Sequence, residues 1–187
     1  MPHLQIVIAS TRPSRKGPAV ALWFEQIART HGGFDVEMVD LAEVDLPLID
    51  EPEHPRLRKY HHEHTKAWSA RVSRADAFVF VTPEYNFSIA PALVNAIDYL
   101  VHEWAYKPVG YVSYGGVSGG LRAVQMSKLL VTSLKMMPIP EAVTLPFFNR
   151  LFDDQGLFVP GEVQDKAATA MLDELTKWAG ALAPLRG

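Results

Sequence analysis

The sequence predicts an α/β fold in which helices cover both faces of a parallel sheet, and three observations support this prediction. Short apolar segments alternate with segments of helical periodicity about five times along the 187 residues, a pattern typical of parallel sheets. Several short segments are apolar throughout, as expected for strands that are buried on both faces. No repeat, composition shift or low-complexity segment divides the chain, so we predict one domain that spans residues 1–187.

The expected strands are short and rich in β-branched or aromatic side chains. They cover residues 4–9, 34–41, 77–81, 108–113 and 139–145. Pro18 suits the first turn of the first helix, and Gly32 with Gly33 would end that helix. The expected helices cover residues 18–31, 57–74, 90–102, 119–136 and 162–182. We expect residues 45–55 and 146–161 to be irregular.

Composition and charge argue against several classes of protein. The formal net charge of −3 gives no general attraction to nucleic acid or to anionic membranes, and the longest apolar runs are far shorter than a membrane span. The chain has no cysteine, which excludes disulfides, thiolate catalysis and thiolate metal sites. The first residues lack a basic region that leads into an apolar stretch, so we expect no secretory signal and a cytoplasmic location.

The loop over residues 10–17 is the first candidate for a ligand site, because ligands bind at the carboxyl ends of the strands in such sheets. It places hydroxyls and three cations directly before a helix N-terminus, where free N–H groups and a partial positive charge favour an anion. These features suit a dianionic phosphate, and a solvated basic turn is the alternative. The sequence contains neither a G-x-x-x-x-G-K-[ST] motif nor a G-x-G-x-x-G motif after the first strand.

Two further loops follow expected strands. Residues 82–88, T-P-E-Y-N-F-S, present backbone N–H groups and Tyr85 at the sheet edge, where they suit a heteroaromatic ring. An ordinary turn built by proline and asparagine is the alternative. Residues 114–120, Y-G-G-V-S-G-G, contain four glycines, which allow the backbone to approach a flat ligand closely or simply form a tight turn.

At these three loops the sequence resembles the NADPH-dependent FMN reductase family, the flavodoxin-like quinone, azo-dye and chromate reductases. The matching pieces are S-T-R-P-S-R-x-G at 10–17, T-P-E-Y-N at 82–86 and Y-G-G-x-S-G-G at 114–120. They occur in the order and spacing of that family, and the resemblance runs from about residue 4 to residue 145. It implies a flavodoxin-like three-layer sandwich, with a five-stranded parallel sheet in the order 2-1-3-4-5 and FMN at the point where the strand order reverses.

The resemblance also implies the residues that bind the cofactor. The FMN phosphate would be bound by Ser10, Arg12, Arg15, Lys16 and Gly17. The isoalloxazine would be bordered, largely through backbone, by Pro83, Glu84, Tyr85 and Asn86. Gly115 and Gly116 would offer N–H groups to the pyrimidine edge of the ring. Many relatives carry serine or asparagine where this chain has Arg15 and Lys16.

The implied activity is that of an NAD(P)H-dependent FMN oxidoreductase. NADPH or NADH would give hydride to bound FMN, and a small acceptor such as a quinone, flavin, azo compound or metal oxyanion would then take the electrons in the same pocket, which gives ping-pong kinetics. No side chain needs to act as a nucleophile or metal ligand, so we assign no catalytic residue and no metal site. The family usually forms homodimers or homotetramers, and we expect one of these with no nucleic-acid or membrane partner.

Several alternatives stay open at this point. A flavodoxin-like electron carrier would hand electrons to protein partners without NAD(P)H turnover, although such carriers are usually strongly acidic; a binding module without activity is a third class. His61 and His64 would share a helix face and suit a metal, or else belong to a solvated helix start. Apolar side chains after the second loop belong either to a subunit interface or to the core. These are Val94, Ile97, Trp104 and Tyr106.

Overall fold

The computed structural model describes residues 1–186 and contains one five-stranded parallel sheet in the order β2-β1-β3-β4-β5. The strands are β1 (His3–Ile8), β2 (Asp35–Asp40), β3 (Ala77–Pro83), β4 (Pro108–Tyr114) and β5 (Met137–Leu145). This is the predicted strand order. It reverses between β1 and β3, because the chain first adds β2 on one side of β1 and then β3 on the other.

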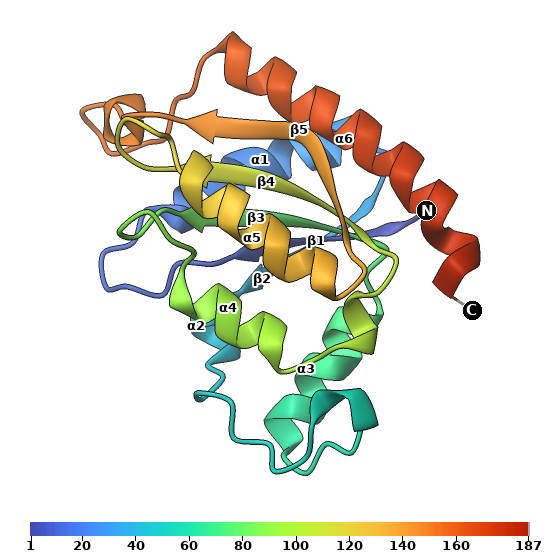
Figure 1. Ribbon diagram of the computed structural model, residues 1–187. Coiled ribbons are helices and arrows are strands. Elements are labelled where there is room, and N and C mark those ends of the chain that lie inside the picture. The colour runs from blue at the N-terminus through green and yellow to red at the C-terminus, as the bar shows by residue number, and fades with distance from the viewer. Residues whose placement is uncertain (187) are drawn as a thin grey trace.

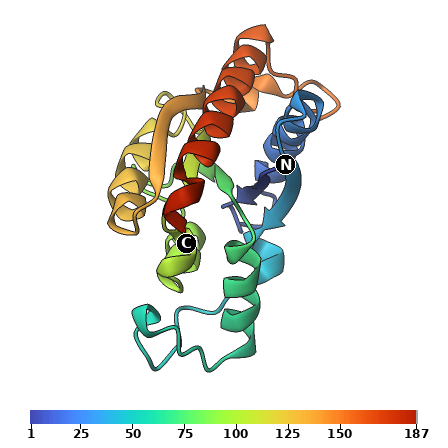
Figure 2. The same cartoon turned by 90° about the vertical axis from the view of Figure 1, so that its right-hand side faces the viewer.

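Helices lie on both faces of the sheet, so the predicted three-layer sandwich is confirmed (Figures 1 and 2). The helices are α1 (Gly17–His31), α2 (Leu41–Val44), α3 (Glu63–Ser73), α4 (Pro91–Asp98), α5 (Leu121–Ser133) and α6 (Glu162–Leu182). Short 3₁₀ turns are η1 (Pro55–Leu57), η2 (His102–Trp104), η3 (Phe148–Leu151) and η4 (Ala183–Arg186). No helix within residues 1–186 has the length and apolar character that a membrane crossing requires.

Two buried clusters hold the layers together, one on each face of the sheet. Phe24 of α1 and Leu172 of α6 belong to the first cluster, and Trp68 of α3 and Trp104 of η2 belong to the second. All residues of β3 and β4 are buried, as expected for central strands covered on both faces. The prediction of one domain over residues 1–187 stays a prediction.

Figure 1 shows the strands with their carboxyl ends on one side of the molecule, where the loops after β1, β3, β4 and β5 gather. The N-terminus lies at the opposite edge. In both Figures 1 and 2, the segment between α2 and α3 extends away from the sheet. The gathered loops are therefore the part of the fold in which residues distant in sequence meet at the strand ends.

The predicted helix over residues 57–74 is shorter than expected and begins only at Glu63. The N–H groups of His61 and His62 donate to the carboxylate of Glu51 at 2.8 and 3.0 Å, so the chain before Glu63 is held by a side chain distant in sequence. His61 therefore lies outside the helix, and His62 stacks on His64 with ring centroids 5.1 Å apart. Within the described residues, no group of three or more metal-ligating side chains is suited to holding a metal ion.

Two other helices end earlier than predicted. The helix expected over residues 90–102 ends at Asp98, and the one expected over 119–136 ends at Ser133, shortly before Lys135 adopts a left-handed φ of 62°. The structure buries Ile97 and Trp104 in the core. The other two candidate interface residues, Val94 and Tyr106, are half-buried.

Candidate functional site

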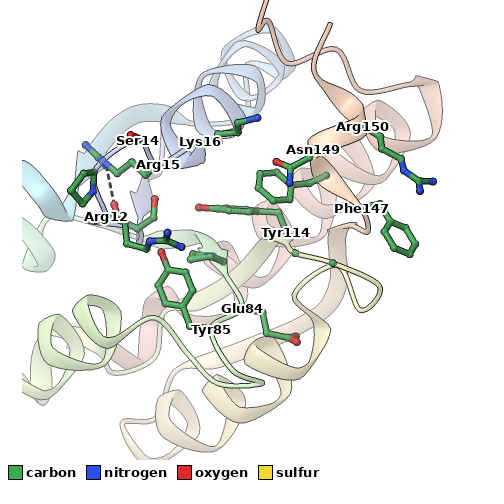
Figure 3. A pocket seen from close by; sticks show the side chains of 16 residues that line it. Arg12, Ser14, Arg15, Lys16, Glu84, Tyr85, Tyr114, Phe147, Asn149 and Arg150 are labelled. Atoms are coloured by element: carbon green, nitrogen blue, oxygen red, sulfur yellow. Dashed lines mark hydrogen bonds between the residues drawn. The ribbon is translucent and has the colours of Figure 1, made fainter.

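A cavity of about 620 Å³ opens at the carboxyl edge of the sheet, among the loops that follow β1, β3, β4 and β5 (Figure 3). Its volume is that of a site for a small organic ligand. Residues 83–85, 114–116 and 147–150 form three of its walls, and the loop after β1 forms the fourth. The cavity therefore lies at the switch point of the strand order, where sheets of this type bind ligands.

All of the predicted site residues except Gly17 and Asn86 line this cavity. Gly17 lies directly behind the lining: a Cβ added there would overlap Ser10 Oγ and approach the Tyr114 hydroxyl to 2.7 Å. Asn86 lies in the tight turn that Tyr85 and Ser88 close with two backbone hydrogen bonds, and it adopts a left-handed φ of 50°. Asn86 thus shapes the loop, while Pro83, Glu84 and Tyr85 before it line the cavity.

The loop after β1 contains two arginines whose surroundings differ. Arg15 donates to both carboxylate oxygens of Asp40, at 2.6 and 2.7 Å, and to the carbonyl of Ser10 at 2.9 Å. The hydrogen bonds to Asp40 raise the pKa of the Arg15 guanidinium above its ordinary value, although burial acts in the opposite direction. Arg12 is exposed and, within residues 1–186, forms no ion pair. Its guanidinium lies 5.8 Å from the ring centroid of Tyr85.

The first turn of α1 has N–H groups that no side chain caps, and a ligand is one of the partners that satisfies such groups. Beside this turn lie the buried hydroxyls of Ser10 and Tyr114. Neither has a hydrogen-bond partner within the described part of the chain. Lys16, at the N-cap, places its ammonium 4.3 Å from the ring centroid of Phe152. This end of the cavity is therefore rich in donors and positive charge.

The opposite end of the cavity is built from backbone. Phe147 and Phe148 donate their N–H groups to the carbonyls of Gly116 and Gly115, at 2.8 and 3.3 Å. The N–H of Gly115 donates to Leu145 at 3.3 Å. The N–H of Gly116, by contrast, has no acceptor within residues 1–186. Of the two predicted glycine donors, only Gly116 thus retains an available N–H.

Glu84 links the loop after β3 to the loop after β4. Its carboxylate accepts from Ser118 Oγ at 2.8 Å and from the backbone and side chain of Arg122, each at 3.1 Å. Burial raises the pKa of Glu84, but these hydrogen bonds outweigh it and leave the pKa below its usual value. Arg122 in turn lies 4.1 Å from the ring centroid of Phe87. The Glu84 carboxylate is therefore engaged in joining two walls of the cavity.

The wall over residues 147–150 and the ring of Tyr114 were not among the predicted site residues. Arg150 lies 4.9 Å from the ring centroid of Phe147, and Tyr114 lies 4.9 Å from Phe148, centroid to centroid. The sequence had a signal for this wall, since residues 146 onward follow the fifth strand at the same edge of the sheet. We had expected that segment to be irregular and had attached no function to it.

The lining contains no histidine, and the chain has no cysteine, so the described residues bring no Ser–His or Cys–His pair together here. What the cavity offers is a donor-rich, positively charged end and, across from it, a backbone-built end with one free N–H. Such an arrangement suits a flat heteroaromatic ligand that carries a phosphate. The unsatisfied hydroxyls, the uncapped helix and the free Gly116 N–H together fit FMN.

Comparisons with known proteins identify the family of this chain. The family model described as NADPH-dependent FMN reductase matches residues 2–150. An NAD(P)H-dependent FMN reductase of Schizosaccharomyces pombe is 40% identical over 148 residues, which cover 78% of this chain and 74% of that protein. A quinone reductase of Pseudomonas putida is 31% identical over 185 residues, 92% of each chain. Among solved structures, a flavoenzyme NAD(P)H:(acceptor) oxidoreductase from Paracoccus denitrificans has a similar fold, with a TM-score of 0.74 at 20% identity, over 97% of this chain and 98% of that one.

Proposed function

The chain belongs to the NADPH-dependent FMN reductase family, and from this premise we propose that FMN binds in the cavity at the carboxyl edge of the sheet and that electrons pass there to a small acceptor. The predicted identity as an NAD(P)H-dependent oxidoreductase that uses FMN is confirmed by this membership. The placement of the cofactor, the kinetic scheme and the acceptor are our proposals.

One observation carries the placement: the two ends of the cavity differ in the way that the two ends of FMN differ. The loop after β1 provides hydroxyls, an uncapped helix N-terminus and the unpaired Arg12, which suit a phosphate. The opposite end provides the free N–H of Gly116, which suits a carbonyl or ring nitrogen of the isoalloxazine. The orientation of the cofactor follows from this difference.

We assign the predicted binding residues accordingly. Ser10, Arg12 and Lys16 contact the phosphate, and Gly17 leaves room for the hydroxyls beside it. Arg15 supports the same phosphate by fixing the shape of the loop through Asp40 and the Ser10 carbonyl.

The ring lies against the loop after β3. Pro83, Glu84 and Tyr85 form this wall, and Asn86 holds its turn. Gly116 donates to the ring edge, while Gly115 holds the loop through its hydrogen bonds to Leu145 and Phe148.

Bound FMN supplies the two-electron hydride chemistry, and the protein binds, orients and tunes it. The N–H of Gly116 favours negative charge at the edge of the ring that it contacts. Because one cavity serves both NAD(P)H and the acceptor, we propose ping-pong kinetics. We assign no catalytic acid, and no lining side chain needs to form a covalent bond.

We propose quinones, free flavins, azo compounds and metal oxyanions such as chromate as candidate acceptors. Relatives of this chain are named NADPH:quinone oxidoreductase and NADPH azoreductase, which supports the first and third of these classes. The homodimer or homotetramer and the cytoplasmic location stay predictions. Light scattering coupled to size-exclusion chromatography measures the oligomeric state directly.

The test is a visible spectrum of the purified protein with and without FMN, followed by anaerobic addition of NADPH and, separately, NADH. We expect a bound yellow chromophore that bleaches on addition of a nicotinamide nucleotide without any second protein, and then reoxidises with a quinone. Absence of flavin binding would overturn the proposed cofactor site. Binding without bleaching by either nucleotide would overturn the reductase function and favour an electron carrier.

A further inference from the structure

Tyr114 is the last residue of β4, and its side chain connects the two ends of the cavity. Its backbone leads directly into Gly115 and Gly116, at the ring end. Its ring packs against Phe148, and Figure 3 shows its hydroxyl directed toward the loop that carries Arg12 and Arg15. The same residue thus begins the glycine loop and places a hydroxyl beside the first turn of α1.

The Tyr114 hydroxyl lies close to Gly17. A Cβ on Gly17 would lie 2.7 Å from the Tyr114 oxygen and would overlap Ser10 Oγ, so both hydroxyls lie against the Cα of the residue that begins α1. Tyr114 is 4% exposed and Ser10 is 1% exposed. Burial raises the pKa of Tyr114 to about 12, and Ser10 acts in the opposite direction. The two hydroxyls nevertheless do not meet hydrogen-bond geometry.

Two buried hydroxyls without partners are costly, because burial removes their hydrogen bonds to water. The Tyr111 hydroxyl is also buried without a partner within residues 1–186, but it lies on the opposite face of the sheet, away from the cavity. Two further tyrosines have acceptors for their hydroxyls. Tyr99 donates to Asp50 and Tyr60 donates to Glu103, each at 2.9 Å. The unsatisfied pair lies beside an uncapped helix N-terminus, which is where the anion of the proposed function would bind. The missing acceptor is thus of the kind that a phosphate provides.

We propose that the Tyr114 hydroxyl belongs to the phosphate site and, together with Ser10 Oγ, donates to phosphate oxygens of bound FMN. The proposal rests on the proposed function and gives a phosphate-binding role to Tyr114, which begins the glycine motif but was not among the predicted site residues. Tyr114 is then a determinant of selectivity for FMN over riboflavin, because only the phosphorylated flavin reaches its hydroxyl.

The experiment measures the dissociation constants of FMN and of riboflavin by flavin fluorescence on wild-type apoprotein, on Tyr114→Phe and on Tyr111→Phe. Tyr111 is the matched control, since it lies on the same strand, is fully buried and belongs to the cluster on the opposite face of the sheet. We expect Tyr114→Phe to weaken FMN binding about tenfold, the usual effect of one hydrogen bond to a charged group. Riboflavin binding should stay within about twofold of wild type, and Tyr111→Phe should change neither constant.

The apoprotein gives a second readout. Removal of an unsatisfied buried hydroxyl should leave the melting temperature of Tyr114→Phe apoprotein unchanged or raised, so weaker FMN binding cannot be attributed to poor folding. Equal losses for FMN and riboflavin would overturn the proposal in favour of a packing role, and unchanged FMN binding would overturn it outright. Failure of the proposed function can be distinguished from failure of this proposal, because the wild-type protein would then bind neither flavin.

Discussion

The two ends of the cavity are built by different means. At the phosphate end, side chains dominate: the hydroxyls of Ser10 and Tyr114 lie unsatisfied beside α1, and Arg12 is free of ion pairs within the described residues. At the ring end, backbone dominates, since the glycine loop is held by hydrogen bonds from Phe147 and Phe148. The difference matches what each end is proposed to bind, a compact dianion at one and the edge of a flat ring at the other.

The two ends of the cavity can be separated by measurement. A side chain at the phosphate end acts on a charge that FMN has and riboflavin lacks, so its removal should change the ratio of the two affinities. A change at the ring end alters a wall that both flavins meet, so it should move the two affinities together. The ratio of the FMN and riboflavin dissociation constants therefore reports which end a residue serves.

Gly17→Ala should have the largest effect. The new methyl would overlap Ser10 Oγ and crowd the Tyr114 hydroxyl, so we expect FMN affinity to fall more than about 100-fold and the apoprotein to lose about 1–3 kcal/mol of stability from overpacking. Flavin fluorescence and urea unfolding measure the two effects.

The matched control for Gly17→Ala is Gly116→Ala at the ring end, where an added Cβ meets nothing within 4 Å. Its free energy of unfolding should stay within about 0.5 kcal/mol of wild type. Wild-type FMN binding by Gly17→Ala would contradict the assignment of Gly17 to a crowded phosphate end.

Arg12→Ala should come next in size. Arg12 is the arginine of this loop that the structure leaves free for a phosphate, and we expect a loss of about 10- to 100-fold in FMN affinity, as for a lost hydrogen bond to a charged group. The loss should shrink as salt is raised, because exposed charges are screened. Riboflavin affinity should not change; an equal loss for both flavins would place Arg12 at the ring through its contact with Tyr85 instead.

Much of the fold was predictable because its signals are local. The strand over residues 77–81 is apolar throughout and lies within β3, and the strand order followed from the family resemblance. The start of α3 was not predictable in this way, because the carboxylate that accepts from the N–H groups of His61 and His62 belongs to Glu51, about ten residues earlier. Local periodicity contains no information about such a contact.

The site was predictable where residue types are unusual, as in the loops with clustered cations or glycines. For the wall over residues 147–150, the sequence indicated only the edge of the sheet, because this segment follows the fifth strand. Its contact with the cavity depends on backbone hydrogen bonds to Gly115 and Gly116, about thirty residues earlier. The side of the sheet that the Tyr114 side chain faces could have been predicted from the sequence. Side chains alternate along a strand, so Tyr111 and Tyr114, three residues apart, must face opposite sides of the sheet.

Glu84→Gln tests the ring end of the cavity. Glutamine keeps an acceptor for Ser118 but loses the charge that pairs with Arg122, so the loops after β3 and β4 should be held less firmly. We expect FMN and riboflavin affinities to fall together by about two- to fivefold, with their ratio unchanged. A loss confined to FMN would show that Glu84 acts on the phosphate end.

The lowered pKa of Glu84 leads to a prediction for the pH dependence of riboflavin binding. Its pKa in the folded protein is lowered below the ordinary glutamate value, so its stabilising contribution is present above that ordinary value and is lost as the pH falls through the lower, folded one. Riboflavin affinity of the wild type should therefore fall on acidification through this window, and the affinity of Glu84→Gln should be flat across it. Parallel titrations of the two proteins provide the measurement.

Asp40→Asn should have the smallest effect on flavin binding. It tests whether Arg15, like Arg12, binds the phosphate or only holds the loop. The Arg15 and Asp40 side chains are only 20% and 13% exposed, so loss of the charge should lower the free energy of unfolding by about 1–2 kcal/mol. Asp45→Asn is the matched control. Asp40 and Asp45 flank α2 at its two ends, but Asp45 is exposed and forms no ion pair within residues 1–186.

If Arg15 serves only to hold the loop, FMN affinity of Asp40→Asn should fall by less than about threefold, far less than in Arg12→Ala. If Arg15 instead binds the phosphate, release from Asp40 should leave its guanidinium freer and raise FMN affinity while stability falls. Urea unfolding and FMN titration on the same preparations separate these outcomes, because the sign of the affinity change differs between them.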